Sequence, residues 1–397
     1  MSSSQPTVDR TEPIEPITAA PLPTRTSRGA RRASLDVLRG GLLAFMLFTP
    51  PYRFEGTYPL LAHADWLGWS LSDLIFPLFL FTSGGSLGYL LRRGMTGKQA
   101  NRLVRRLIAL IVLGLLYNAI GSGFDLATLR FTGVLQLIGV SGALGAVAVT
   151  ILDRIVPDRP VLGVAATLGV TWVVYAIVMG IADCWQTTVG CSPFHGIDVR
   201  LLGEGHVYRA GAGYDPEGIV VMIAATWIVL VGYLGTLALR DVAGRDLAVR
   251  SAWLVGAGIV AFVLALLLDP VSPISKRVMS PTFLLLAAGI GLVLYGLLAA
   301  ALDTEARQRW VGTTRSVLAW PFTTLGWNAL VVYLGERIAV VAAAQTTVAG
   351  DPAYQWFLDT LAPTYGDRAG LMLGLALVAL LLAITGVMRG LKWHVAL

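Results

Sequence analysis

The sequence predicts an all-α membrane protein of about ten transmembrane helices, with both termini in the cytoplasm. Hydrophobic residues make up 55% of the chain and charged residues only 14%, and the mean hydropathy is +0.70. Apolar runs recur at the length of about 20 residues that a helix needs to cross the hydrocarbon core. Composition and periodicity together exclude a soluble globular protein.

The predicted crossings follow one another with short connections. They cover residues 34–50, 72–92, 103–121, 130–152, 160–182, 217–239, 251–269, 280–302, 319–343 and 367–389. Residues 1–33 are rich in Pro, Ser, Thr and Glu and are predicted to form a disordered cytoplasmic tail. Residues 34–397 then form a single membrane domain.

The distribution of positive charge predicts the orientation. Most of the 30 Lys and Arg residues fall in the tail and at alternate connections, and short cytoplasmic connections retain positive charge. The basic side, which includes Arg92, Arg93, Arg105 and Arg106, is therefore predicted to be cytoplasmic. Topology also accounts for the net charge of +6, so no nucleic-acid partner is expected.

Three connections on the opposite side are rich in polar and aromatic residues and indicate a site that faces outward. They run over residues 51–70, 182–217 and 269–281. Cys184 and Cys191 both fall in the second connection, where a disulfide is the preferred interpretation and two free thiols the alternative. The sequence contains no Cys/His spacing typical of a metal site.

Ionisable side chains within the predicted helices are costly in lipid and therefore suggest function. Asp36 and Arg39 stand three residues apart on one helix face, where an ion pair would partly offset their burial. They either anchor the first helix or take part in chemistry. Asp73 and Asn328 also fall at membrane depth.

His63 precedes the apolar run that forms the second helix, within the block His63-Ala64-Asp65-Trp66-Leu67-Gly68-Trp69. An imidazole can take a proton from an amine or a hydroxyl at neutral pH, and a nearby carboxylate can set its tautomer. Asp65 and Asp73 are both candidates for that carboxylate. The alternative is a hydrogen-bonding histidine at the membrane interface, packed by the neighbouring tryptophans.

Several separated blocks of the sequence resemble the heparan-alpha-glucosaminide N-acetyltransferase family within the wider membrane acyltransferases. They are Ser34-Leu35-Asp36-Val37-Leu38-Arg39-Gly40, the His63 block continuing into Asp73-Leu74-Ile75-Phe76-Pro77, Gly133-Val134-Leu135-Gln136, Tyr214-Asp215-Pro216-Glu217-Gly218, Pro273-Ile274-Ser275-Lys276 and Gly326-Trp327-Asn328-Ala329-Leu330. The chain departs from the family pattern at Thr49-Pro50-Pro51, where an Asn is common, and at Leu137, where an Arg is common.

The resemblance implies transfer of an acetyl group from cytoplasmic acetyl-CoA to an amino sugar or cell-envelope glycan across the membrane. It implies that His63 is the reacting residue, either as general base or as carrier of the acetyl group, with Asp73 orienting the ring. Asp65, Trp66, Lys276 and Asn328 are expected to contact the acceptor.

The cofactor phosphates are expected to meet arginines near the cytoplasmic side. The candidates are Arg39, Arg92, Arg93, Arg105 and Arg106, although topology alone can also explain most of them. No metal is implied. The expected setting is the plasma membrane of a bacterium, with lipid as a partner and a homodimer as one arrangement.

A second functional class shares these features. A transporter or flippase for a lipid-linked sugar would use the same buried polar residues to bind cargo without forming a bond. The sequence shows no internal repeat, which disfavours the transporter, because many secondary transporters are built from two related halves.

Overall fold

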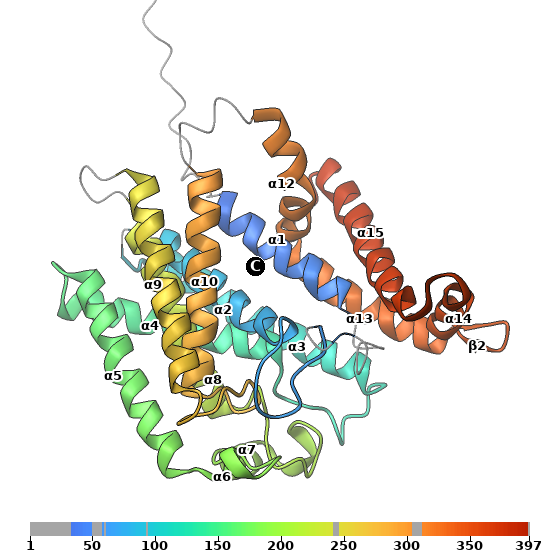
Figure 1. Ribbon diagram of the computed structural model, residues 1–397, viewed down its shortest axis with the longest axis horizontal. Coiled ribbons are helices and arrows are strands. Elements are labelled where there is room, and N and C mark those ends of the chain that lie inside the picture. Colours follow the sequence, from blue (N-terminus) through green and yellow to red (C-terminus); the bar gives the residue numbers. More distant parts are fainter. Residues whose placement is uncertain are drawn as a thin grey trace, which may run out of the picture. The chain divides into compact units, whose positions relative to one another are not determined.

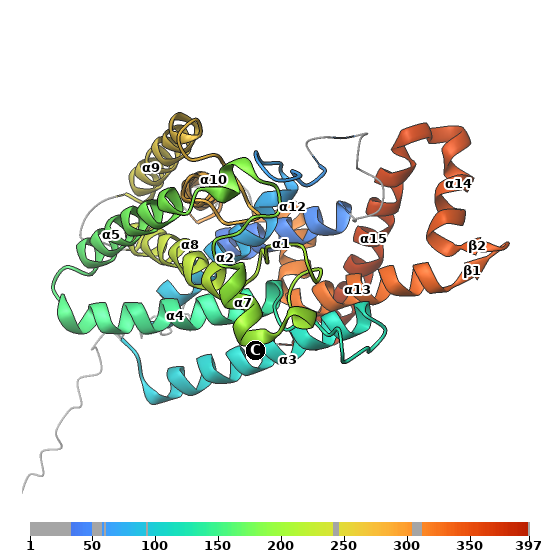
Figure 2. The same ribbon diagram turned by 90° about the horizontal axis from the view of Figure 1, so that it is seen from below.

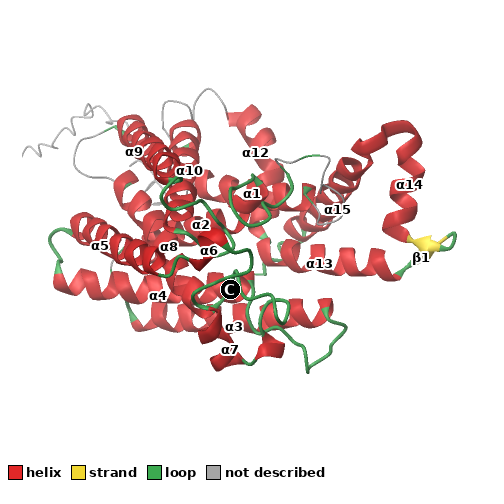
Figure 3. Ribbon diagram, turned by 60° about the horizontal axis from the view of Figure 1, so that its bottom comes forward, coloured by secondary structure: helices red, strands yellow, loops and turns green. Residues whose placement is uncertain are grey.

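The computed structural model describes residues 33–49, 58, 61–92, 94–240, 246–303 and 312–395, with only the backbone of residues 312–318 and 367. The tail through residue 32, Pro50-Pro51 and Arg93 were named in the predictions and lie outside the described residues. Among the described residues, the regular secondary structure is helical apart from a short hairpin, and loops join the helices (Figure 3).

The first half of the chain contains five long helices and the elements of the second polar connection. They are α1 (Ala33–Phe48), η1 (Ser72–Leu74), α2 (Ile75–Leu90), α3 (Gly97–Gly121), α4 (Val134–Ile155), α5 (Pro160–Ile181), α6 (Cys184–Thr187), α7 (His195–Leu202) and η2 (Glu204–His206).

The second half repeats the pattern of long helices joined by short connections. It contains α8 (Ile219–Leu239), α9 (Leu247–Leu268), α10 (Pro281–Leu302), α12 (Gly312–Trp327), α13 (Ala329–Gln345), the antiparallel strands β1 (Thr347–Val348) and β2 (Asp351–Pro352), α14 (Ala353–Tyr365), η3 (Gly366–Arg368) and α15 (Ala369–Gly390).

The fold class predicted from the sequence is confirmed. Within the described residues, eight helices are long and apolar enough to span a membrane, or nine if the bent pair Ala319–Trp327 and Ala329–Gln345 forms one broken span. The remaining predicted crossing corresponds to α1. Its 16 residues extend about 24 Å at the usual helical rise, less than the hydrocarbon thickness of roughly 30 Å.

Close helix contacts explain how α1 is held. It packs against α12, α10, α15 and α2, and Gly40 of the Ser34–Gly40 block lies directly against the backbone of Phe322 in α12. A Cβ at residue 40 would lie only 1.7 Å from the carbonyl oxygen of Phe322. Small residues permit such approaches in membrane bundles, so Gly40 serves helix packing.

Two further pairs of helices form much of the core. Helix α2 lies along α8, and α9 lies along α10 (Figure 1). A Cβ at Gly84 would come within 1.8 Å of the Val229 carbonyl oxygen, and one at Gly258 within 2.6 Å of the Gly289 carbonyl oxygen. These glycines therefore set the helix separations that position the ends of α2 and α10, where the candidate site is found.

Candidate active site

His63 and Asp73 form a hydrogen-bonded pair at the start of the second long helix. The Nδ1 atom of His63 lies 2.8 Å from Oδ1 of Asp73. An ionised carboxylate can only accept hydrogen bonds, so Nδ1 carries a proton, and in the neutral imidazole Nε2 then keeps its lone pair. The His63 side chain is 51% exposed whereas that of Asp73 is 2% exposed, so an imidazole open to ligands rests on a buried carboxylate.

The turn before α2 holds Asp73 rigidly. Its second oxygen, Oδ2, accepts hydrogen bonds from the backbone N–H groups of Ala64 and Ser70, each at 3.0 Å, and from the Ser70 hydroxyl at 3.1 Å. The residue itself lies in the 3₁₀ turn η1 that leads into α2. Backbone donors to a carboxylate favour its charged form, and here they also fix its orientation toward His63.

Lys276 supplies a cation to the same carboxylate from a segment more than 200 residues away. Its Nζ lies 3.2 Å from Oδ1 of Asp73 and 3.3 Å from Nδ1 of His63. Burial lowers the pKa of Lys276 below its usual range, although the carboxylates of Asp73 and Glu217 act in the opposite direction. The site is thus a His–Asp–Lys cluster, and among the described residues no side chain or backbone group forms a hydrogen bond with Nε2 of the imidazole.

The third polar connection clamps the loop that carries His63. Arg277 donates hydrogen bonds to the backbone carbonyls of Ala64 and Asp65, and the Ser275 hydroxyl donates to the carbonyl of Trp66 at 2.7 Å. These contacts bring two connections that are distant in sequence to one side of the helices. Asp65 leaves its side chain exposed beside His63.

Trp66 anchors this loop through its buried side chain. Its ring is 5% exposed, its indole N–H donates to the Trp185 carbonyl at 2.7 Å, and it meets the ring of Tyr214 edge-on at 4.9 Å. The second polar connection therefore joins the same assembly. Cys184 and Cys191 of that connection are disulfide-bonded.

An ionic cluster that the sequence analysis did not single out lies in the same assembly. Arg130 donates to the carboxylates of both Asp215 and Glu217, and Thr132 donates to Asp215. Burial lowers the pKa of Arg130, but the two carboxylates outweigh it and the net shift is upward. The quoted block Tyr214–Gly218 contained the acidic partners, but no sequence rule linked it to Arg130.

A second polar group gathers on α2 nearer its other end. Arg39 of α1 donates to the Ser86 hydroxyl at 2.8 Å and pairs with Asp36 at 3.6 Å. Arg106 of α3 contacts the Ser83 hydroxyl at 3.4 Å. Two of the five arginines expected to bind a cofactor thus converge on neighbouring turns of α2.

The other residues expected to bind ligands lie elsewhere. Arg92 and Arg105 are exposed. Asn328 is fully buried, donates to the Trp393 carbonyl at 3.1 Å and accepts from the Val395 N–H at 3.0 Å. The Asn328 amide thereby ties down the C-terminal segment, and its expected contact with the acceptor stays a prediction.

Comparison with known proteins finds one matching family model and two similar curated proteins. The family model described as heparan-alpha-glucosaminide N-acetyltransferase, catalytic, matches residues 31–198, a range that includes His63 and Asp73. This chain resembles the heparan-alpha-glucosaminide N-acetyltransferases. The resemblance inferred from the sequence blocks is therefore confirmed.

Two curated heparan-alpha-glucosaminide N-acetyltransferases are similar over most of the chain. The mouse protein (Mus musculus) is 24% identical over 373 residues, which cover 79% of this chain and 54% of the mouse protein. The human protein (Homo sapiens) is 23% identical over 367 residues, covering 78% of this chain and 53% of the human protein. The chain spans about half the length of the curated relatives that it matches.

The part matched by the heparan-alpha-glucosaminide N-acetyltransferase model ends before Lys276. It contains His63, Asp73, Arg39 and Arg106. The contact of Lys276 with Asp73 is therefore a feature that the three-dimensional structure adds to the resemblance.

Proposed function

We propose that this multi-pass membrane protein is an acetyltransferase that moves an acetyl group from cytoplasmic acetyl-CoA to an amino sugar or envelope glycan on the other side, in a bacterial plasma membrane. The observation that carries the proposal is the half-exposed His63 imidazole, whose Nδ1 is hydrogen-bonded to Asp73 and whose Nε2 has no partner among the described residues. An acyl transfer to an amine requires a base of this kind at the reacting atoms.

The direct reaction balances with His63 as the base. The acceptor nitrogen attacks the thioester carbonyl carbon, and Nε2 takes the proton that the nitrogen loses. The new C–N bond forms, the C–S bond breaks, and coenzyme A leaves as a thiolate. Asp73 stabilises the imidazolium that results, and Lys276 offsets the charge of Asp73 in the resting site.

The same geometry supports a two-step route. Here Nε2 itself attacks the thioester carbonyl, coenzyme A leaves, and the acetyl group rests on the imidazole until the acceptor amine removes it. Both routes need the tautomer that Asp73 selects. They differ in one observable, because only the second gives labelled protein when acetyl-CoA is added without an acceptor.

Arg39 of α1 and Arg106 of α3, which contact the other half of α2, suit the acetyl donor. Coenzyme A carries phosphate groups, which guanidinium groups bind well. Arg106 contacts a serine hydroxyl, and within the described residues it makes no ion pair with a carboxylate. Arg39 lies close enough to raise the local positive potential. A half-buried cation that pairs with no described carboxylate in a membrane protein suggests an anionic ligand.

The test is acetyl transfer by purified protein, using radiolabelled acetyl-CoA and a panel of amino sugars. His63→Ala should reduce transfer by at least about a hundredfold, the scale of general base catalysis, while the melting temperature stays near that of the wild type. His394→Ala is the matched control, because His394 is exposed and stacks on Trp327 near the C-terminus.

Full transfer by His63→Ala would refute the assignment of His63. If the wild-type protein does not bind acetyl-CoA, the enzyme reading fails and transport of a lipid-linked sugar becomes the better explanation. Label that stays on wild-type protein without an acceptor, and is absent from His63→Ala, would select the two-step route.

A further inference from the structure

The carboxamide of Gln136 is buried inside the helix bundle without a hydrogen-bond partner. Gln136 lies in the first turn of α4 and is 3% exposed. Within the described residues, neither Oε1 nor Nε2 has a partner. An unpaired buried amide costs a few kcal/mol, so most such groups in folded proteins are satisfied by protein, water or a ligand.

The neighbours of Gln136 make room for the amide but do not bond to it. A Cβ at Gly114 of α3 would lie 2.1 Å from Oε1 of Gln136, and one at Gly133 would lie 2.9 Å from it. The Asn118 amide, which also lies near Gly133, donates both of its N–H groups to the carbonyls of Arg130 and Thr132. Glycines thus admit the Gln136 side chain to a place where nothing in the described chain pairs with it.

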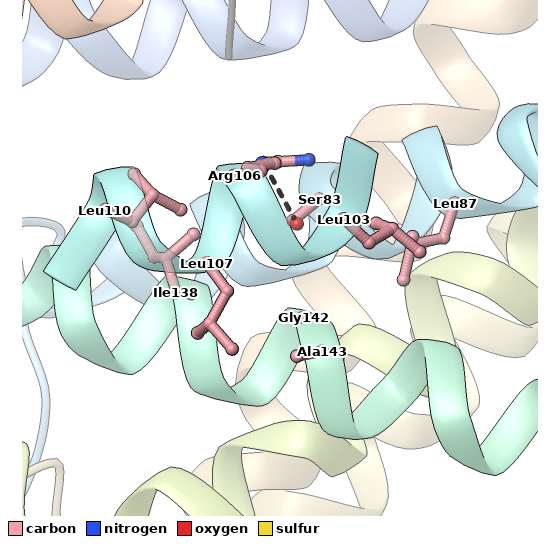
Figure 4. A pocket seen from close by; sticks show the side chains of 10 residues that line it. Ser83, Leu87, Leu103, Arg106, Leu107, Leu110, Ile138, Gly142 and Ala143 are labelled. Carbon is pink, nitrogen blue, oxygen red and sulfur yellow. Dashed lines mark hydrogen bonds between the residues drawn. The ribbon is translucent and has the colours of Figure 1, made fainter. Parts of the chain in front are cut away.

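A pocket lies between α2, α3 and α4 (Figure 4), and Gln136 is not among the residues that line it. Figure 2 shows α3 and α4 running side by side, as their contacts require. The pocket is lined by Ser83 and Leu87 of α2, Leu103, Arg106, Leu107 and Leu110 of α3, and Ile138, Gly139, Gly142 and Ala143 of α4. Its polar feature is the contact between Arg106 and Ser83.

Helical spacing places Gln136 beyond the end of this pocket, in line with its walls. On α4, Gly139 and Ala143 follow Gln136 by three and seven residues, and on α3, Gly114 follows Arg106 by eight. Residues at these separations share a helix face. At the usual rise, the eight residues from Arg106 to Gly114 extend about 12 Å along α3. Arg106 and the Gln136 amide beside Gly114 therefore lie about one such distance apart along the interface between α3 and α4, called here the α3–α4 seam.

The seam runs toward the candidate active site. Beyond Gly114, α3 ends at Gly121 and the following connection carries Arg130, which binds Glu217. Glu217 is close enough to Lys276 to raise its pKa. The order along the seam is therefore Arg106, then Gln136, then the ionic groups near His63.

We infer that Gln136 binds the pantetheine arm of the acetyl donor, with its Nε2–H donating to a carbonyl oxygen of the arm and its Oε1 accepting from an amide N–H. This assignment rests on the proposed function. A carboxamide with a free donor and a free acceptor is complementary to a secondary amide, and the arm contains two such amides between the phosphates and the thioester. A charged ligand would not select this residue type.

The test compares Gln136→Met with wild type by ligand-induced thermal shift and by titration, using acetyl-CoA and adenosine 3′,5′-bisphosphate as separate probes. The second probe has the phosphates without the arm. Gln136→Met should bind acetyl-CoA about tenfold more weakly, as expected for losing one or two hydrogen bonds, and should bind the bisphosphate as the wild type does. Gln355→Met, on α14, is the matched control.

The stability of the ligand-free protein separates a ligand role from a role in folding. The methionine side chain is similar in size to that of glutamine and lacks the unpaired amide. Because the cost of burying that amide is removed, the variant should melt at the wild-type temperature or above it. A lower melting temperature with unchanged acetyl-CoA affinity would overturn the inference. If the methionine variant does not fold, Gln136→Asn retains an amide but withdraws it by one methylene, and unchanged acetyl-CoA affinity in it would overturn the inference equally.

The outcome also distinguishes this inference from the proposed function. If wild type shows no thermal shift with acetyl-CoA, both fail. If wild type and Gln136→Met shift alike, the role of Gln136 fails while the acetyltransferase proposal stands.

Discussion

Lys276 Nζ lies 3.2 Å from Oδ1 of Asp73, the oxygen that also accepts the hydrogen bond from His63. One carboxylate oxygen therefore serves both the imidazole and a cation brought from the connection between α9 and α10. The arrangement links the tautomer of His63 to a contact that spans more than 200 residues of sequence, and it leads to the first two predictions.

Asp73→Asn should lower acetyl transfer by about a hundredfold or more. The asparagine amide can donate to Nδ1 and so favour the imidazole tautomer that protonates Nε2, which removes the free lone pair. A tautomer change of this kind costs up to about ten thousandfold in a serine protease triad. Turnover and melting temperature should be measured together. Loss of folded protein in place of turnover would mean that Asp73 serves mainly the turn before α2.

Lys276→Met should lower turnover by about tenfold, because a charge-assisted hydrogen bond to Asp73 is lost. Its effect should depend on Asp73, since the two side chains are in contact. The double variant with Asp73→Asn should therefore lose little more activity than Asp73→Asn alone. Lys98→Met, at the exposed start of α3, is the control. Strictly additive losses would separate Lys276 from the dyad.

Arg130→Met should destabilise the protein by about 3 kcal/mol, because it leaves the buried Asp215 and Glu217 carboxylates without their cation. The expected readout is a lower melting temperature at neutral pH. Arg209→Met is the matched control, since Arg209 lies over the same Tyr208 ring but is exposed. Equal melting temperatures for the two variants would contradict the structural role of the Arg130 cluster.

Asp198 should make stability fall as the pH rises from about 4 to about 6. Burial raises the pKa of Asp198 to about 6, and Asp215 adds to the increase, while the Ile219 N–H and His195 oppose it. An unfolded aspartate titrates near about 4, so between these values the folded state binds more protons than the unfolded state. Deprotonation in this window therefore weakens folding.

Melting curves of Asp198→Asn between pH 4 and pH 6 should be flatter than those of the wild type, because asparagine can still accept from the Ile219 N–H but does not titrate. Asp125→Asn is the control that should leave the slope unchanged, since hydrogen bonds from Thr128 and Ala127 lower the pKa of Asp125 and its titration therefore lies below this pH range. Parallel curves for Asp198→Asn and wild type would show that Asp198 does not titrate in this range.

Local sequence was sufficient to predict the His63–Asp73 pair, but it did not predict that Lys276 contacts the same carboxylate. His63 and Asp73 are ten residues apart on either side of a helix start, so a short block contains both, although spacing alone also allowed Asp65 as the carboxylate. The indole N–H of Trp66 donates to the carbonyl of Trp185, and the expected contact of Trp66 with the acceptor stays a prediction.

Residues whose partners lie on distant helices could not be assigned from sequence. Lys276 was expected at the acceptor and is bonded to Asp73. Asn328 was expected in the cavity and is bonded to the C-terminal segment. The role of Arg130 could not be predicted, because no sequence pattern connects it with Asp215 and Glu217.

The sequence by itself determined the all-helical membrane fold, nearly all of the helix positions and the identity of the His–Asp pair. These follow from apolar length, from the cost of exposing backbone groups to lipid and from contacts within one short block. Tertiary structure alone decided which cation meets Asp73, which arginines converge on α2 and that the Gln136 amide is left unpaired. Each of these depends on how helices far apart in sequence pack. That packing is set by close contacts at glycines, such as Gly40 of α1 against α12 and Gly114 of α3 against Gln136 of α4.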